Sequence, residues 1–189
     1  RHGMPEELAQ QLSVYTADTF KAMLLASANR QFSVSYGIIC LPGKNANVTA
    51  DVMGLFQECY EPITYAQMAE RLWYIPIDRV KHELVTEKSV VMIEQETYFY
   101  APNFPISTHE LAALQRAMHR RIEDEGFLVA RSLREVMQIH CPNAVMDTAG
   151  WKDWGIRNVM AWLLRDQFGF NGVVICTKGA GMDTHMVFR

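Results

Sequence analysis

The sequence lacks a long apolar run. Such a run is the simplest sign of a membrane protein. The longest apolar stretches of this chain, such as AMLLASA and YGIICLP, are far shorter than the roughly 20 residues that a membrane-spanning helix needs. No charged leader followed by an apolar core opens the chain either. We therefore expect a soluble, cytoplasmic protein without a membrane partner.

Paired cysteines and catalytic motifs are also missing. The four cysteines are widely spaced and include no CxxC pair, which predicts buried thiols in a reducing compartment rather than a disulfide scaffold. His140 and Cys141 are adjacent, so their side chains diverge, and no segment has zinc-ligand spacing or a nucleophile elbow. KGAG follows an expected strand but opens no helix, unlike a phosphate loop. We expect no catalytic residue, no metal site and no cofactor, and any catalytic domain would lie outside this chain.

The sequence carries no positive excess. Its 18 Lys and Arg against 21 Asp and Glu give a net charge of −3, although the C-terminal half is slightly basic. Proteins that bind nucleic acid without specificity usually have a clear positive excess, because phosphate neutralisation supplies most of that affinity. The charge therefore counts against DNA binding and favours a protein partner.

The remaining composition, 49% apolar and 21% charged, is that of a folded globular protein. A length of 189 residues allows one sizeable domain or two small ones, and we expect two small cores. The opening RHGM before PEEL and the closing THMVFR lead us to expect a piece of a longer protein.

The pattern along the chain predicts three segments. Residues 1–46 begin with a helical stripe after Pro5 and continue into a strand or extended connection at 32–41, which ends in the turn-rich PGKNAN. Residues 47–103 and residues 104–189 each read as helix, short strand, helix, helix and hairpin. PNFPIS, with two prolines, reads as a short stiff linker between these two units.

In residues 47–103, Thr49 is expected to cap the first helix, and Thr64 with Gln67 has capping-box spacing before the second. The third helix, about 76–87, has Ile77, Val80 and Leu84 at helical spacing for burial. VVMI and TYFYA are then expected to form a hairpin around EQE.

In residues 104–189, Ser107 with Glu110 forms another capping box, Gly126 ends that helix, and Ser132 is expected to cap the next. CPNAVMDTAGWKDW reads as a long corner. A helix at about 153–168 precedes a last hairpin, in which FNGVVICT and THMVF flank the loop KGAGMD.

This order of elements resembles the winged helix-turn-helix superfamily, twice in tandem. The resemblance implies a mainly α fold with small β-hairpins (α+β), preceded by a helical N-terminal segment. It also implies that IDRVKHELVTE and WGIRNVMAWLLRDQF are recognition helices, which enter the DNA major groove in that family.

The recognition helix of the second unit is the better DNA candidate from its residues. With Ile156 inward, Arg157, Asn158 and Arg165 fall on one outer stripe with Ala161, and Arg and Asn are the residue types that read guanine and adenine edges. Lys152 and Lys178 are expected to contact phosphates. The alternative is that Arg157 and Arg165 make surface ion pairs with Asp153 and Asp166.

The first unit offers Arg79, Lys81 and His82, but these residues are mixed with Asp78 and Glu83. Its expected hairpin adds Glu94 and Glu96, which would repel phosphates. The alternative interpretation of this helix face is a solvated surface without a partner.

Aromatic residues gather at two places: Trp151, Trp154 and Trp162 around the second recognition helix, and Tyr98, Phe99 and Tyr100 in one strand of the first hairpin. Such rings usually belong to a core. The alternative is a partner surface, in which the two units bury their rings against each other or against another chain.

The sequence therefore favours a non-enzymatic module that binds double-stranded DNA, in a transcription-related or other nucleic-acid-handling protein. The alternative is a protein-interaction, scaffolding or dimerisation module built from winged helices, with a protein partner or a second copy of the chain.

Overall fold

The computed structural model describes residues 43–179 without a gap and, before them, residues 16, 18, 19, 22, 23, 26, 32–35 and 38–41. The predicted N-terminal helical segment falls largely outside the described residues. Within the described part of the chain, no helix combines the length and apolarity needed to cross a bilayer.

A small hairpin comes first. Strands β1 (Ser33–Ser35) and β2 (Ile38–Cys40) pair antiparallel, with Ser33 opposite Cys40. The Ser33 hydroxyl donates to the carbonyl of Lys44 at 3.1 Å, which ties the hairpin to the following segment. The stretch predicted as one strand or extended connection therefore folds back on itself.

The first unit places three helices against a small sheet. Its elements are α3 (Val48–Gln57), β3 (Ile63–Thr64), α4 (Tyr65–Arg71), α5 (Ile77–Thr86), β4 (Val90–Glu94) and β5 (Thr97–Tyr100). The antiparallel sheet has the order β3-β5-β4. Val52, Phe56, Met68 and Val80 are fully buried between the helices and the sheet.

The second unit repeats this order with one additional helix. Its elements are the 3-10 turn η1 (Ala101–Asn103), α6 (Thr108–Glu125), β6 (Leu128–Val129), the 3-10 turn η2 (Ala130–Ser132), α7 (Leu133–His140), α8 (Pro142–Asp147), α9 (Asp153–Leu163), β7 (Phe168–Asn171) and β8 (Val174–Thr177). The sheet order is β6-β8-β7. The predicted corner contains a short helix, α8. Pro142 is compatible with this helix because it lies in the first turn, where the missing N–H of proline removes no helical hydrogen bond.

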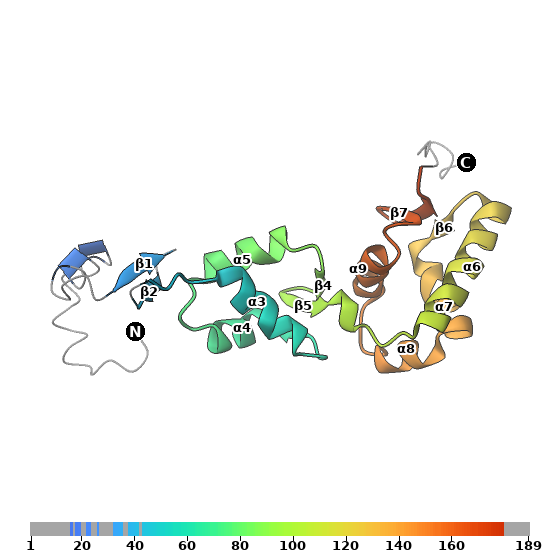
Figure 1. Ribbon diagram of the computed structural model, residues 1–189. Helices are drawn as coiled ribbons and strands as arrows, with labels where there is room; N and C mark the ends of the chain where they lie inside the picture. The colour runs from blue at the N-terminus through green and yellow to red at the C-terminus, as the bar shows by residue number, and fades with distance from the viewer. Residues whose placement is uncertain are drawn as a thin grey trace.

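In both sheets the last strand lies between the other two, and the helices precede the hairpin. This is a winged-helix-like α+β arrangement, and the predicted fold class is confirmed. Figure 1 shows the hairpin, the first unit and the second unit in a row, with α6 on the far side of the second unit.

The helix caps agree with the sequence at two capping boxes and differ at two other sites. Thr64 with Gln67 and Ser107 with Glu110 form complete boxes. Helix α3 is capped by Asn47, whose side chain accepts from the N–H of Ala50 at 3.1 Å, and not by Thr49. Ser132 makes no side-chain cap, because its own backbone is already helical, whereas capping requires an extended residue.

The last hairpin differs from the prediction. FNGVVICT forms both strands, with Asn171 opposite Val174 and the turn at Gly172 and Val173. Gly172 has φ +58°, a conformation that glycine adopts without strain and that suits a tight hairpin turn. The segment THMVF, predicted as the second strand, lies outside the described residues.

The β4–β5 hairpin contributes to two hydrophobic cores. Val90 packs in the first core, whereas Ile93 and Phe99 belong to the second, together with Ala101 and Phe104. The predicted stiff linker therefore begins inside the second core, and Phe104 is only 5% exposed.

Candidate nucleic-acid interface

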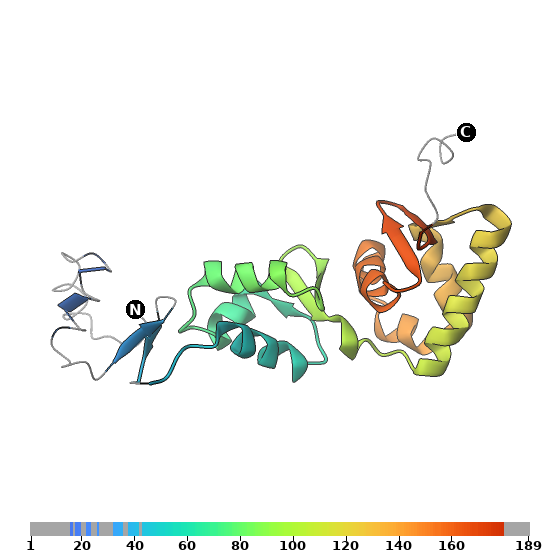
Figure 2. The same cartoon turned by 45° about the horizontal axis from the view of Figure 1, so that its top comes forward.

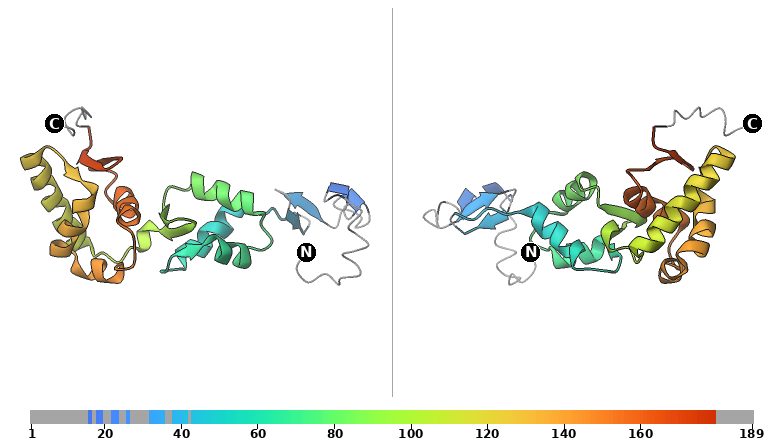
Figure 3. Two further views of the ribbon diagram at one scale, coloured as in Figure 1. Left: turned by 180° about the vertical axis from the view of Figure 1, so that it is seen from behind. Right: turned by 45° about the vertical axis from the view of Figure 1, so that its right-hand side comes forward.

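Helix α9, which the sequence predicts as the recognition helix of the second unit, lies against strand β4 of the first unit. Figures 2 and 3 show this contact from three further directions. Gly155 meets the backbone of Ile93 so closely that an added β-carbon would clash with it. The Asn158 amide donates to the carbonyl of Met92 at 2.9 Å. The part of α9 around Gly155 and Asn158 is therefore covered by the first unit.

Charged and aromatic side chains extend this contact. Lys152 Nζ lies 2.7 Å from the carboxylate of Glu94 in the β4–β5 hairpin. The Trp151 ring packs edge-on against Phe99, with their centroids 4.8 Å apart, and also touches Phe104. Trp151 and Phe99 therefore pack their rings against each other between the two units.

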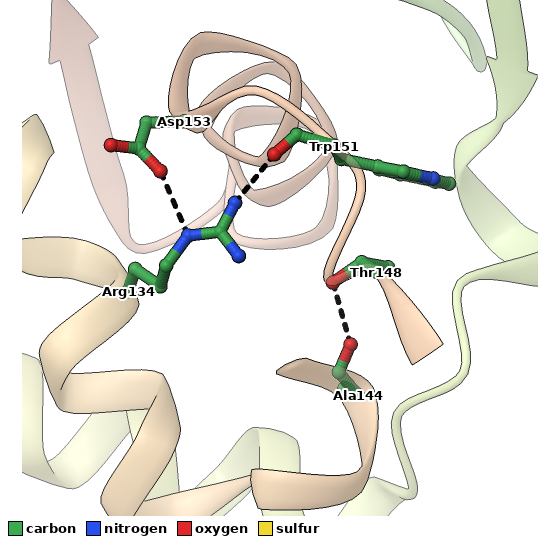
Figure 4. Close-up of polar contacts among 5 residues, drawn as sticks. All are labelled: Arg134, Ala144, Thr148, Trp151 and Asp153. Carbon is green, nitrogen blue, oxygen red and sulfur yellow. Dashed lines mark hydrogen bonds and ion pairs between the residues drawn. The ribbon is translucent and has the colours of Figure 1, made fainter. Parts of the chain in front are cut away.

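Arg134 of α7 positions the loop that carries Trp151. Its Nε donates to Asp153 at 2.8 Å and its Nη2 donates to the Trp151 carbonyl at 2.7 Å. The buried Thr148 hydroxyl donates to the Ala144 carbonyl at 2.6 Å, which fastens the start of the loop. Figure 4 shows the Trp151 ring extending away from Arg134.

Arg157 does not lie on an open stripe. It is half-buried and donates to the Asn158 side chain and to the Phe170 carbonyl, both at 3.1 Å. Its Nε is buried without a hydrogen-bond partner, and burial lowers the pKa of the guanidinium. The alternative ion pair with Asp153 is also wrong, because Asp153 pairs with Arg134.

Arg165 and Lys178 lie together at the C-terminal end of α9. Arg165 is exposed, donates to the Trp162 carbonyl at 2.8 Å and stacks over the Trp162 ring at 4.1 Å. The Lys178 amine donates to the Arg165 carbonyl at 3.0 Å. No ion pair joins Arg165 to Asp166 within the described residues.

Helix α5 of the first unit, in contrast, exposes its predicted residues. Val80 and Leu84 face the core, while Arg79, Lys81 and His82 are exposed. Lys81 Nζ lies 5.6 Å from the centre of the Tyr65 ring. Ile77, predicted to be buried, is 36% exposed at the first position of the helix, whereas Val80 in the same turn is buried.

A recess of about 840 Å³ lies beside α5. Arg79 and His82 line it, together with Asn45 and Thr49 from the start of α3 and Val34 from β1. The Thr49 hydroxyl donates to Glu83 at 2.9 Å, so this carboxylate already has a partner. The recess thus brings a guanidinium, an imidazole and amide groups together on one face.

The structure therefore groups the predicted residues differently from the sequence. Arg79 lies with His82, and Arg165 lies with Lys178, whereas Lys152 and Asn158 contact the first unit. The contact between the units was missed, although a glycine near the start of a helix is a signal of close backbone approach. DNA contact by any of these residues stays a prediction.

No protein-family model matches the chain, and no curated protein sequence matches it. Among solved structures, the chain is similar to the mRNA-binding domain of elongation factor SelB from E. coli in complex with SECIS RNA. The identity is 9%, the match covers 70% of this chain and 98% of that chain, and the TM-score is 0.35.

Proposed function

We propose that this chain is a non-enzymatic nucleic-acid-binding module that binds double-stranded DNA through helix α5, within a transcription-related or other nucleic-acid-handling protein. We also infer that both units belong to the winged helix-turn-helix superfamily. Free, buried Cys141 and Cys176 are consistent with a reducing, cytoplasmic setting.

The contrast between α5 and α9 supports this assignment. Both are predicted recognition helices, but in α9 the exposed residues are Asp153 and Trp154 at its start, whereas Arg79, Lys81 and His82 of α5 are exposed. A recognition helix must present side chains to base edges and phosphates. Of these two helices, α5 exposes more of its polar side chains.

Two of the carboxylates that count against DNA binding by this helix have partners, and one of them, Glu94, is paired with a cation. Glu94 pairs with Lys152, and Glu83 accepts from Thr49. Asp78 and Glu96 remain exposed near the approach of a phosphate. The balance therefore favours moderate, salt-sensitive binding rather than tight binding.

The test is fluorescence anisotropy with labelled duplex DNA at low salt, repeated over a salt series. Arg79→Ala and Lys81→Ala are expected to weaken binding, and each lost phosphate contact should reduce the log–log salt slope by about 0.9. Arg116→Ala is the matched control, because this exposed arginine lies on α6, far from α5.

The variants Arg157→Ala and Asn158→Ala test whether α9, rather than α5, binds DNA. Both are expected to lower stability while leaving DNA affinity of the folded protein unchanged. Absence of duplex binding at low salt, or loss of binding in the α9 variants alone, would contradict the proposal.

A protein-interaction or dimerisation role is favoured by one observation. Trp73 is 70% exposed at the corner before α5, beside the partly exposed Tyr74 and Ile77. Exposed apolar groups that adjoin each other often mark a protein interface. Sedimentation equilibrium of the wild type and Trp73→Ser tests it: a dimer that dissociates in the variant supports this role.

A further inference from the structure

A shallow apolar groove of about 440 Å³ lies where the two units meet. Helix α5 forms one wall through Leu84 and Val85, and α9 forms the other through Ala161 and Trp162. Strand β4 lies between them, as Figure 1 shows, and contributes Met92. Val85 is 76% exposed and Met92 is 41% exposed, so this apolar surface is open.

The rim of the groove is cationic. Lys88 and Arg165 stand on its two sides and are exposed, and no ion pair engages either one within the described residues. The rim carboxylate Glu87 accepts from both the backbone N–H and the hydroxyl of Ser89. An approaching ligand therefore meets two cations, and the adjacent carboxylate is already hydrogen-bonded.

We propose that this groove docks an acidic amphipathic helix of a partner protein. Its apolar stripe would cover Val85 and Met92, and its flanking carboxylates would face Lys88 and Arg165. Helix-in-groove recognition uses apolar anchors at a spacing of three and four residues with a charged rim.

The geometry favours a helix over the other occupants. An extended strand would have to pair with β4, but the Met92 carbonyl already accepts from Asn158. A nucleic-acid base needs an open aromatic face, but Arg165 stacks on the Trp162 ring. The aliphatic walls instead match Leu or Ile side chains.

This inference is separate from DNA binding by α5. The residues in the proposed DNA contact, Arg79 to His82, precede the last turn of that helix, in which Val85 lies. The groove also requires α9 to lie on β4, so an occupant would stabilise the contact between the units.

The experiment uses a fluorescein-labelled synthetic helix with leucine at every third or fourth position and glutamate between. A scrambled peptide of the same composition, without the stripe, serves as the control ligand. The full chain is expected to bind the striped peptide, and Val85→Asp and the double variant Lys88→Glu/Arg165→Glu should each weaken binding at least about tenfold.

Two control variants match the test variants in exposure and in change of net charge. Ile139→Asp changes a residue of α7 that is also 76% exposed, and Arg116→Glu/Arg120→Glu changes the net charge equally. Both should leave peptide binding unchanged, with circular dichroism confirming that every variant folds.

Equal binding of the scrambled peptide, or an equal loss in the matched variants, would overturn the proposal. So would loss of duplex DNA binding in Val85→Asp without any peptide binding, because the groove would then be a nucleic-acid contact. If the wild type does not bind duplex DNA and Arg79→Ala changes nothing, the proposed DNA binding fails. The outcome of the peptide test is not affected by that result.

Discussion

Gly155 of α9 lies against the backbone carbonyl of Ile93 in β4, at a separation that leaves no room for a β-carbon. Gly155→Ala is therefore expected to push α9 from β4 and to lower the free energy of unfolding by about 1–3 kcal/mol. Gly54→Ala in α3 is the control, because nothing lies within 4 Å of the added atom. It should stabilise by about 0.5–1 kcal/mol. Urea denaturation of both variants measures the contrast, and a stabilised Gly155→Ala would contradict the close contact.

The ion pair between Lys152 and Glu94 should contribute little on its own. Both side chains are at least half exposed, at 59% and 50%, and exposed pairs are worth about 0.2–1 kcal/mol. A double-mutant cycle with Lys152→Ala and Glu94→Ala measures the coupling, and it should shrink in high salt. The Arg121 and Glu125 pair within α6 provides a reference cycle. A coupling that salt leaves unchanged would contradict this expectation.

Asn158 links α9 to β4 through one hydrogen bond to Met92. Asn158→Ala is expected to cost about 1 kcal/mol of unfolding free energy, since the carbonyl loses its donor. Asn158→Asp should cost more, because a carboxylate would face that carbonyl oxygen. Asn143→Ala on exposed α8 is the matched control and should be nearly neutral. Thermal unfolding followed by circular dichroism gives the comparison.

Glu110 gives the capping box of α6 a pH dependence. Hydrogen bonds from Ser107 lower the pKa of its carboxyl below the ordinary value. The stabilisation is therefore present above the ordinary carboxyl pKa and is lost as the pH falls through the lowered pKa. Glu110→Gln should cost about 0.3–1 kcal/mol at neutral pH, and the difference from wild type should vanish in acid. Glu123→Gln, exposed on the same helix, should show no such trend in parallel urea titrations.

Cys141 should react only when the protein opens. It is fully buried, and burial raises the pKa of its thiol to about 11. Relative to its ordinary pKa, the thiolate fraction at pH 8 falls about a hundredfold, before exclusion of the reagent is considered. Alkylation followed by mass spectrometry should therefore modify half-buried Cys40 and Cys59 before Cys141. Equally fast labelling of Cys141 in native buffer would contradict its burial.

The sequence predicted what depends on neighbours along the chain. Capping boxes at Thr64 and Ser107 need only residues three apart, and the order of helices and hairpins follows from local periodicity. The turn at Gly172 was also readable, because a glycine between two apolar runs suits the first position of a two-residue hairpin loop, although the longer KGAGMD loop obscured it.

The site could not be predicted in the same way. Whether Asn158 faces solvent depends on β4, more than 60 residues earlier in the chain, since Asn158 bonds to Met92, and Arg157 bonds to Phe170 of the later strand β7. Helical periodicity separates an inner face from an outer one, but it does not reveal that the first unit covers part of the outer face of α9. The sequence predicts that the charge of Glu94 repels phosphate. The same long-range contact instead pairs this carboxylate with Lys152.

The position of α9 also protects the first unit from self-association. Strand β4 is the outer strand of its sheet, and an uncovered outer strand offers free backbone groups to strands of other molecules. Asn158 saturates the Met92 carbonyl, and Gly155 lets the helix lie flat along the strand. Removal of the second unit would therefore uncover an outer strand of the first unit's sheet, the kind of edge that can pair with strands of other molecules.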